Sequence, residues 1–357
     1  MKLSSDKFPR KTRAAILVEQ GKPLVVDEIE LPEVLDVGQV LVELAFSGIC
    51  GSQLGEIDGV KGPDKWLPHL LGHEGAGKVL AVGPGVRHVQ PCDTVVAHWK
   101  PSLGIESNVP QYRWCAETIN AGWVTTFNRH AVISENRLTP IPCDIDLKVA
   151  ALYGCAVTTG FGLIDNQSGL RLGEDVVVFG AGGIGLHIIQ AAHLAGARKI
   201  LAVDLFENRL ALARHCGATE TINGAAADPW AKISDFLGGK GPDIFVDNTG
   251  NPEVISRGYD LINAAGRVLL VGVPNQAAVT TLRTLPLHFG KRIVGSHGGE
   301  AEPHKDIRRY LNLTAHRGIG FEELISDVRP LACINEQIAD MRSGATVGRC
   351  MIDLAAV

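Results

Sequence analysis

The sequence predicts an α/β protein made of a strand-rich domain and a doubly wound parallel sheet. Its 357 residues are enough for two domains, each with its own core. Between residues 14 and 96, short runs alternate apolar and polar side chains and are broken by glycine and proline, which is typical of half-buried strands. From about Asp175, apolar runs are separated by segments of helical periodicity, and this pattern predicts parallel strands with helical crossovers.

In the first domain, residues 40–44 and 77–82 are expected strands, and the irregular stretch 98–129 is expected to be a long excursion over them. In the second domain, the apolar runs 175–179, 200–203, 244–246 and 268–271 are expected to be buried parallel strands. An apolar stripe over 184–195 predicts a helix between the first two of them. After about Gly299 the alternation fades. The tail is therefore expected to pack back on the first domain and to end in a strand at 349–354.

Composition and charge exclude several classes of protein. The 34 basic and 39 acidic side chains give a net charge of −5, so no overall positive field favours nucleic acid or an anionic membrane. No apolar run approaches the roughly 20 residues that span a bilayer, and the first 20 residues lack the apolar core of a secretion signal. We therefore expect a cytoplasmic protein with a small-molecule partner, no nucleic acid and no membrane. Its eight cysteines include no C-x-x-C pair and are expected to be thiols or metal ligands.

A glycine-rich loop directly follows the first expected parallel strand. It runs from Gly180 through Gly182, Gly183 and Ile184 to Gly185 and opens a helix. Such a loop lets the backbone approach a pyrophosphate, which the helix N-terminus then favours. Asp204 ends the next expected strand, where an acid accepts hydrogen bonds from the adenosine ribose and repels a 2′-phosphate, so NAD is predicted over NADP. The alternatives are that the glycines only allow close packing and that Asp204 is an ordinary loop acid.

Three separate segments carry residues with metal-binding chemistry: Cys50 in a turn, His73 beside Glu74, and Cys155. Two thiolates and one imidazole would give a tetrahedral zinc three ligands and leave the fourth position open, as catalysis requires. Their wide separation also differs from the short spacings of structural zinc sites. Taken singly, each cysteine could equally be a core residue, and His73 could be a satisfied core histidine.

The order of the motifs GICGS, GHEGAG, GCAVTTG and GAGGIG resembles that of the zinc-dependent medium-chain alcohol dehydrogenase family over essentially the whole chain. The resemblance implies a GroES-like catalytic domain at residues 1–156 and 299–357 and a Rossmann NAD-binding domain at 157–298. It further implies one catalytic zinc on the three ligands, and hydride transfer between an alcohol and NAD. The roles it implies are Ser52 carrying the substrate proton, Glu74 beside the metal, Thr159 at the nicotinamide, Arg209 at the adenosine ribose and Arg349 at the pyrophosphate.

The chain also departs from the family pattern. Of the four cysteines that hold a structural zinc in many members, only Cys115 is present, so one zinc per chain is expected. Gln53 stands where an acid usually supports the zinc histidine, and its uncharged amide would support that ligand less. Gly55 replaces a histidine that passes the proton to solvent in some members. The proton must then leave by water or another side chain.

The resemblance places the substrate pocket at His98, Trp99, Phe127 and His297, with Lys100, Arg113 and Arg129 nearby in sequence. Aromatic walls with basic groups suit a polar alcohol, such as a polyol or a sugar-derived or phosphorylated alcohol, although the basic residues could equally be solvated loop residues. The alternatives are a zinc-free quinone or enone reductase of the same fold and a non-catalytic binding protein that retains the fold. The resemblance also implies a homodimer or a homotetramer.

Overall fold

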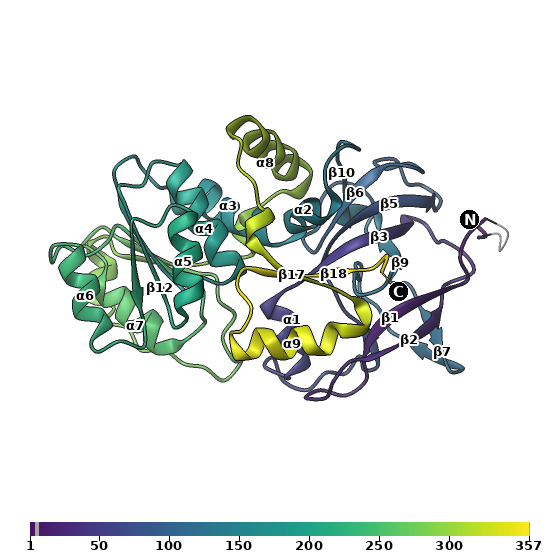
Figure 1. Ribbon diagram of the computed structural model, residues 1–357, viewed down its shortest axis with the longest axis horizontal. Helices are drawn as coiled ribbons and strands as arrows, with labels where there is room; N and C mark the ends of the chain where they lie inside the picture. The colour runs from purple at the N-terminus through teal and green to yellow at the C-terminus, as the bar shows by residue number, and fades with distance from the viewer. Residues whose placement is uncertain (4–6, 357) are drawn as a thin grey trace. The chain divides into compact units, whose positions relative to one another are not determined.

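The computed structural model describes residues 1–3 and 7–356. The chain divides into two compact units, Met1–Cys155 with Glu302–Val357 and Ala156–Ala301. The predicted boundaries fall within three residues of these. In Figure 1 the second unit is the part that runs from teal to light green.

The first unit is built on two sheets. In its described residues one sheet has five strands in the order β4-β1-β2-β7-β8, and the other has seven in the order β10-β6-β5-β3-β18-β17 with β9 also paired to β3. The strands of the smaller sheet are β1 (Lys11–Leu17), β2 (Val25–Glu30), β4 (His69–Leu70), β7 (Tyr112–Trp114) and β8 (Glu117–Ile119). Those of the larger sheet are β3 (Gln39–Ile49), β5 (Glu74–Val82), β6 (Thr94–His98), β9 (His130–Ser134), β10 (Leu138–Pro140), β17 (Ile325–Pro330) and β18 (Arg349–Asp353).

Strand β3 separates two apolar cores. Val40, Val42 and Leu44 belong to one buried cluster, whereas Leu41 belongs to another. Successive side chains of a strand point to opposite faces, so this alternation is what a strand buried on both sides requires. The predicted strand at 40–44 is confirmed within a longer element.

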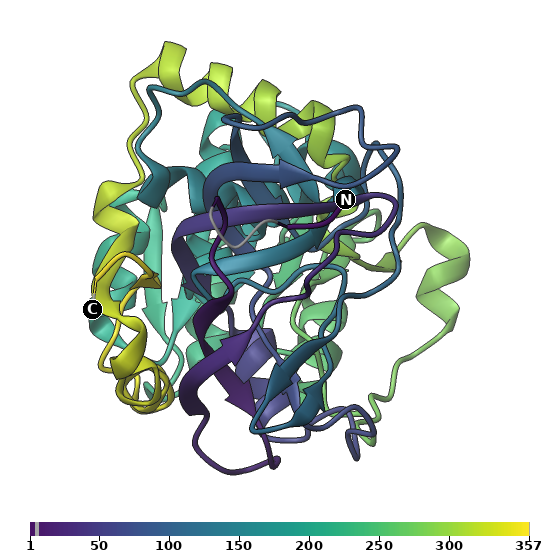
Figure 2. The same cartoon turned by 90° about the vertical axis from the view of Figure 1, so that its right-hand side faces the viewer.

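The C-terminal segment returns to the first unit, as predicted. Strand β18 pairs antiparallel with β3 through Cys350 and Ile49, Met351 and Gly48, and their neighbours. Helix α9 lies beside β17 and β18 in both views (Figures 1 and 2). The helices of this unit are α1 (Gly51–Ile57), α2 (Leu147–Ala151), α8 (Pro303–Arg317) and α9 (Ile334–Ser343), with 3₁₀ turns at Glu135–Arg137, Leu152–Gly154, Glu322–Leu324 and Leu331–Cys333.

The second unit contains a parallel sheet of six strands in its described residues, in the order β13-β12-β11-β14-β15-β16. The strands are β11 (Asp175–Phe179), β12 (Lys199–Asp204), β13 (Glu220–Asn223), β14 (Ile244–Asp247), β15 (Arg267–Leu270) and β16 (Arg292–Gly295). The helices are α3 (Ala156–Gly162), α4 (Gly183–Leu194), α5 (Glu207–His215), α6 (Pro229–Phe236) and α7 (Pro252–Leu261), with a π-helical turn at Leu163–Ser168 and 3₁₀ turns at Leu285–Phe289 and Gly298–Glu300. The doubly wound sheet is confirmed. Val177, Leu201, Phe245 and Val268 of neighbouring strands share one buried cluster.

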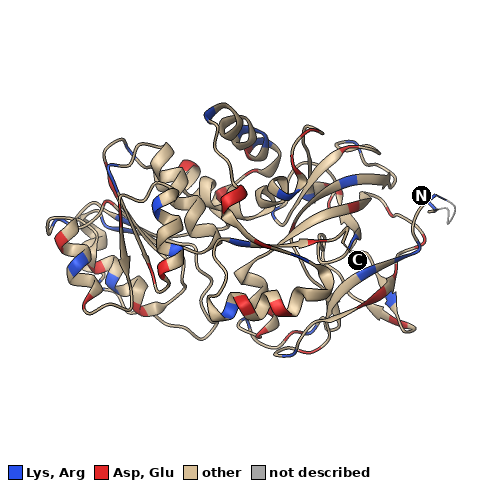
Figure 3. Ribbon diagram, in the orientation of Figure 1, with Lys and Arg blue, Asp and Glu red and all other residues tan. Residues whose placement is uncertain are grey.

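Basic and acidic side chains are interspersed within each unit (Figure 3). No single helix in the described part of the chain is long and apolar enough to cross a membrane, and one bent pair, Leu147–Gly154 with Ala156–Ser168, meets the length and composition criteria only when taken together.

The excursion at 98–129 forms only the short strands β7 and β8 and is otherwise irregular. Glu135 anchors part of it. The Glu135 Oε1 accepts hydrogen bonds from the backbone N–H groups of Arg87 (2.5 Å) and His88 (2.8 Å), and its Oε2 accepts one from Ile105 (2.8 Å). Burial alone would raise the pKa of Glu135, but the three N–H donors outweigh it and hold this pKa below the usual value.

We predict that Glu135→Gln lowers the free energy of unfolding at pH 7 by about 1–3 kcal/mol, because an amide has one oxygen and must turn its NH₂ group toward a buried donor. The stability supplied by Glu135 is present above the pKa of the unfolded chain and is lost as the pH falls through the lower folded pKa. The deficit of the variant should therefore shrink toward acid in urea titrations. Glu33→Gln, at a side chain 73% exposed, is the control. Equal stability of Glu135→Gln and the wild type at pH 7 would contradict the prediction.

Candidate metal centre and dinucleotide site

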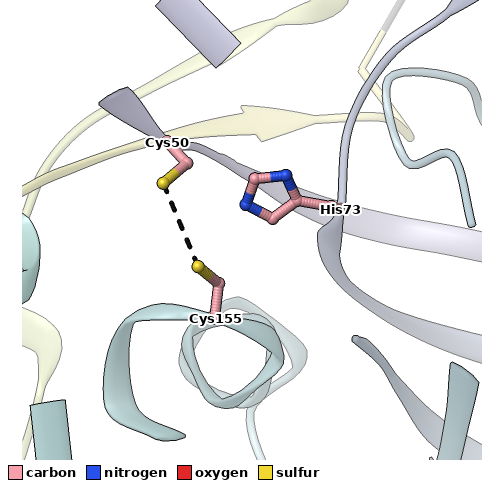
Figure 4. A group of neighbouring side chains, drawn as sticks. All are labelled: Cys50, His73 and Cys155. Carbon is pink, nitrogen blue, oxygen red and sulfur yellow. Dashed lines mark hydrogen bonds between the residues drawn. The ribbon is translucent and has the colours of Figure 1, made fainter. Parts of the chain in front are cut away.

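Three elements of the first unit bring Cys50, His73 and Cys155 together (Figure 4). Cys50 follows the last residue of β3 and caps the N-terminus of α1, His73 immediately precedes β5, and Cys155 follows the 3₁₀ turn Leu152–Gly154. One ligand atom from each side chain lies within 4.8 Å of the other two. The sulfurs of Cys50 and Cys155 are 3.9 Å apart.

This geometry fits zinc. Zinc–sulfur bonds of about 2.3 Å at a tetrahedral angle place two sulfurs about 3.8 Å apart. The donor set of two thiols and one imidazole is one that zinc prefers, and it leaves one of four positions for another ligand. The three residues that the sequence predicted as ligands therefore lie where one ion could contact all of them.

The two thiols differ in their electrostatic environments. The thiol of Cys155, and to a smaller extent the charge of Arg349, hold the pKa of Cys50 well below its usual value although burial opposes this. The sulfur of Cys50 and burial raise the pKa of Cys155 well above the usual value. One thiol of the pair thus gives up its proton readily, and a bound cation would favour the thiolate form of both.

Gln53 supports the backbone of a ligand residue. Its Oε1 accepts a hydrogen bond from the backbone N–H of Cys50 at 2.9 Å, and its own backbone N–H donates to the Cys50 carbonyl at 3.0 Å. The residue that replaces the usual acid thus fixes the start of α1, where Cys50 projects its sulfur.

The predicted role of Arg349 at a pyrophosphate does not match its surroundings. Its guanidinium donates to Glu74 from Nε (2.8 Å) and Nη2 (2.5 Å), and the side chains of Arg349 and Glu74 are 4% and 0% exposed. A bidentate pair of this kind occupies the donor face that a pyrophosphate would need. Arg349 therefore serves the first unit as the partner of the carboxylate next to His73, a contact between residues 275 positions apart that motif reading could not find.

Two predicted substrate-pocket residues lie in the interior of the first unit. Burial lowers the pKa of His98 to about 4, so its ring is neutral at pH 7. Its Nδ1 donates to the Lys100 carbonyl at 2.8 Å, and its Nε2 accepts from the Thr139 hydroxyl at 3.0 Å, so both ring nitrogens are already engaged. Phe127 belongs to the main apolar core. Neither placement fits the expected substrate contact, whereas Trp99 is half-buried and, in the second unit, His297 is exposed.

The glycine loop of the second unit has the geometry that a dinucleotide needs. Gly180 has a φ of +98°, which favours glycine, and a side chain at Gly185 would collide with the Gly180 carbonyl. A carbon added at Gly182 would meet no described atom within 4 Å, so the backbone is open there. Gly182 caps α4, which begins with Gly183 and Ile184 and therefore presents free N–H groups beside the loop.

Asp204 lies beside this loop at the end of β12. Its Oδ2 accepts from the backbone N–H of Ala181 at 2.8 Å and its Oδ1 from that of Phe206 at 3.1 Å. Arg209, on α5, places Nη1 3.7 Å from Asp204 Oδ1. The structure thus brings together the acid, the basic residue and the glycine loop that the sequence predicted to bind a dinucleotide.

The remaining predicted residues lie on short helices. Ser52 is half-buried in the first turn of α1, two residues after Cys50. Thr159 is buried in α3 of the second unit. Sequence reasoning missed a further cluster in the first unit, Glu56, Asp64 and His69, whose ligand atoms also lie within 4.8 Å of one another. The spacing of these three residues matches no motif.

A cluster of two cysteines and one histidine in a strand-rich unit, with a glycine loop and acid on a parallel sheet, defines the class of zinc-dependent dehydrogenases. Comparison with known proteins shows the family. A family model described as "Alcohol dehydrogenase GroES-like domain" matches residues 36–143, and one described as "Zinc-binding dehydrogenase" matches residues 183–316. The chain belongs to the zinc-dependent medium-chain alcohol dehydrogenase family, and it is an oxidoreductase that acts on alcohols.

Individual relatives resemble the chain over nearly its full length. It is 30% identical to the "NDMA-dependent alcohol dehydrogenase" of Amycolatopsis methanolica over 94% of this chain and 97% of that protein. It is 28% identical to the "S-(hydroxymethyl)glutathione dehydrogenase" of Paracoccus denitrificans over 94% of this chain and 98% of that protein. Among solved structures, benzyl alcohol dehydrogenase from Acinetobacter calcoaceticus is 26% identical with a TM-score of 0.86, over 96% of this chain and 99% of that one.

We predict that Arg349→Met lowers the free energy of unfolding by about 3–5 kcal/mol, because the buried charge of Glu74 loses its guanidinium partner. The double variant Glu74→Gln/Arg349→Met should be more stable than Arg349→Met alone, because it removes that charge. Urea denaturation of the four forms of the double-mutant cycle measures the difference. Arg10→Met, at a surface pair with Glu33 (4.0 Å), serves as the control and should change little. A single variant as stable as the wild type would refute the role given to the pair.

Proposed function

We propose that this protein transfers a hydride between a polar primary or secondary alcohol and NAD, using one zinc per chain held by Cys50, His73 and Cys155. The observation that carries the proposal is the approach of these three ligand atoms to within 4.8 Å of one another. The relatives' names support alcohol chemistry, but their substrates differ, so the particular alcohol does not transfer from them.

Zinc in this site would supply a Lewis acid that lowers the pKa of a bound hydroxyl group. The chain's own residues supply position and proton transfer. Cys50 and Cys155 stand at junctions between elements, and the Glu74–Arg349 pair fixes the strand that follows His73. Ser52, two residues beyond Cys50, is the proposed carrier of the substrate proton.

The glycine loop and Asp204 support NAD as the cofactor. The Asp204 carboxylate would accept ribose hydroxyls and repel the 2′-phosphate of NADP. Thr159 and Arg209 are proposed to contact the nicotinamide and the adenosine ribose. Since one relative is named for NDMA, assays should include NDMA as an electron acceptor beside free NAD.

A zinc-free quinone or enone reductase is the second candidate, and the ligand cluster disfavours it because such an enzyme has no use for that cluster. A non-catalytic protein is disfavoured because the relatives over nearly the whole chain are named as enzymes. We further propose a homodimer or homotetramer in the cytoplasm, on the strength of the family alone.

We predict about one zinc per chain by elemental mass spectrometry on extensively dialysed protein. Cys50→Ala and His73→Ala should bring the zinc content near zero and abolish NAD-linked alcohol oxidation while circular dichroism stays unchanged, because each removes one of three ligands. Cys115→Ala, at an exposed cysteine outside the cluster, is the matched control and should keep its zinc. Full activity in a folded Cys50→Ala protein would refute the zinc assignment.

We predict that Asp204→Asn raises the ratio of kcat/KM for NADP to that for NAD at least tenfold, because it removes the charge that repels the 2′-phosphate but keeps an acceptor. Fluorescence titration with each dinucleotide measures binding separately from turnover. Asp235→Asn, at an exposed acid on α6 of the same unit, should leave the ratio unchanged. An unchanged ratio in Asp204→Asn would exclude this acid from cofactor selection.

A further inference from the structure

A cavity of about 570 Å³ in the first unit reaches His73. Its volume falls in the range of small-molecule sites. Besides His73, its wall carries the polar side chains of Gln53, Glu56, Asp64, His69 and Asn120. Trp66 and Trp123 add aromatic surface.

Gln53, a residue of this wall, has a side-chain hydrogen-bond donor without a partner in the described part of the chain. Its side chain is 1% exposed, and its Nε2 finds no acceptor among the residues that the structure describes. The orientation of the amide is fixed, because its oxygen must face the N–H of Cys50. A buried amide donor without a partner costs free energy, which a ligand oxygen would recover.

The charges on the wall are those of an acidic cluster around one imidazole. The Nε2 of His69 lies 2.8 Å from Asp64 Oδ2 and 3.9 Å from Glu56 Oε1, and its Nδ1 lies 2.9 Å from the Leu70 carbonyl. Both ring nitrogens therefore face oxygen atoms, so even a fully protonated His69 balances only one of the two carboxylates. None of the described residues on the wall is a lysine or an arginine.

Two cations lie over the rings of Trp66 and Trp123 without belonging to the described wall, and they do not reverse this balance. Lys65 stacks on Trp66, which is 60% exposed, so water screens its charge. Arg137 lies over Trp123 and pairs with Glu106 at 3.0 Å. The side chains of the wall thus keep two carboxylates, Glu56 and Asp64, against the imidazole of His69, a balance that disfavours an anion.

We infer that this cavity binds the hydroxyl-bearing part of an uncharged polyol or sugar-derived alcohol and rejects alcohols that carry a phosphate or carboxylate. A hydroxyl group can accept from Gln53 and donate to Glu56, which an alkyl chain cannot do. The tryptophan faces suit the C–H side of such a molecule. The inference rests on the proposed function, which it narrows to one of the substrate classes left open above.

The experiment compares sorbitol, sorbitol 6-phosphate and 1-hexanol on the zinc-loaded protein with NAD. Binding is measured by saturation-transfer NMR, so that it does not depend on turnover, and kcat/KM is measured for each alcohol. We expect saturation transfer to sorbitol, and kcat/KM values for hexanol and for the phosphate ester at least tenfold below that for sorbitol.

The variant Glu56→Gln removes one carboxylate at a partly exposed position and keeps its size. It should raise the ratio of kcat/KM for the phosphate ester to that for sorbitol at least threefold, and added salt should reduce this effect because its origin is electrostatic. Glu33→Gln removes the same charge from a glutamate outside the cavity wall and should leave the ratio unchanged.

The outcomes separate this inference from the proposed function. Turnover of hexanol without binding of sorbitol would overturn the inference and the polar substrate, and would leave the zinc- and NAD-linked oxidation of alcohols standing. A preference for the phosphate ester would overturn the inference alone. A second zinc per chain that Glu56→Gln removes would also overturn it, because the cluster of Glu56, Asp64 and His69 would then be a metal site. Binding of sorbitol that Glu33→Gln preserves, with no alcohol oxidised, would support the ligand class and refute the function.

Discussion

The buried ion pair between Glu74 and Arg349 is the constraint on which the candidate metal centre depends. Arg349 opens β18, which pairs with the end of β3, and Cys50 follows the last residue of β3. Glu74 opens β5 directly after His73. One interaction therefore ties the backbones that carry two of the three ligands. Gly48 makes room for it, because a side chain there would collide with the Glu74 carboxylate.

The sequence predicted the second unit well because a strand covered on both faces must be apolar at every position. The apolar runs at 175–179, 200–203 and 244–246 lie within β11, β12 and β14, and the run at 268–271 lies within one residue of the end of β15. Glycine gave equally clear signals at the dinucleotide loop, because Gly180 has a backbone conformation that other residues rarely adopt. The three proposed metal ligands could also be predicted from the sequence, because two cysteines and a histidine in motifs that follow this order are an uncommon pattern.

Long-range contacts of ordinary polar residues could not be predicted in this way. Nothing local in the sequence distinguishes Arg349, which pairs with Glu74, from an arginine that binds phosphate. His98 was expected in the substrate pocket, but its place in β6 turns its ring toward Lys100 and Thr139. The cluster of Glu56, Asp64 and His69 is likewise assembled by tertiary structure, since it joins the end of α1, a loop and β4.

Gln53 connects the candidate metal centre with the cavity beside it. Its side-chain oxygen accepts a hydrogen bond from the backbone N–H of Cys50, and the same side chain lines the cavity. A carboxylate at this position could accept from Cys50 but could offer no donor to a ligand, and it would add a further negative charge to a wall that already carries Glu56 and Asp64. The amide thus keeps its hydrogen bond with the backbone of Cys50 and adds a side-chain donor to a residue of the cavity wall. An amide in place of the usual acid therefore bears on the proposed substrate site as well as on the proposed metal site.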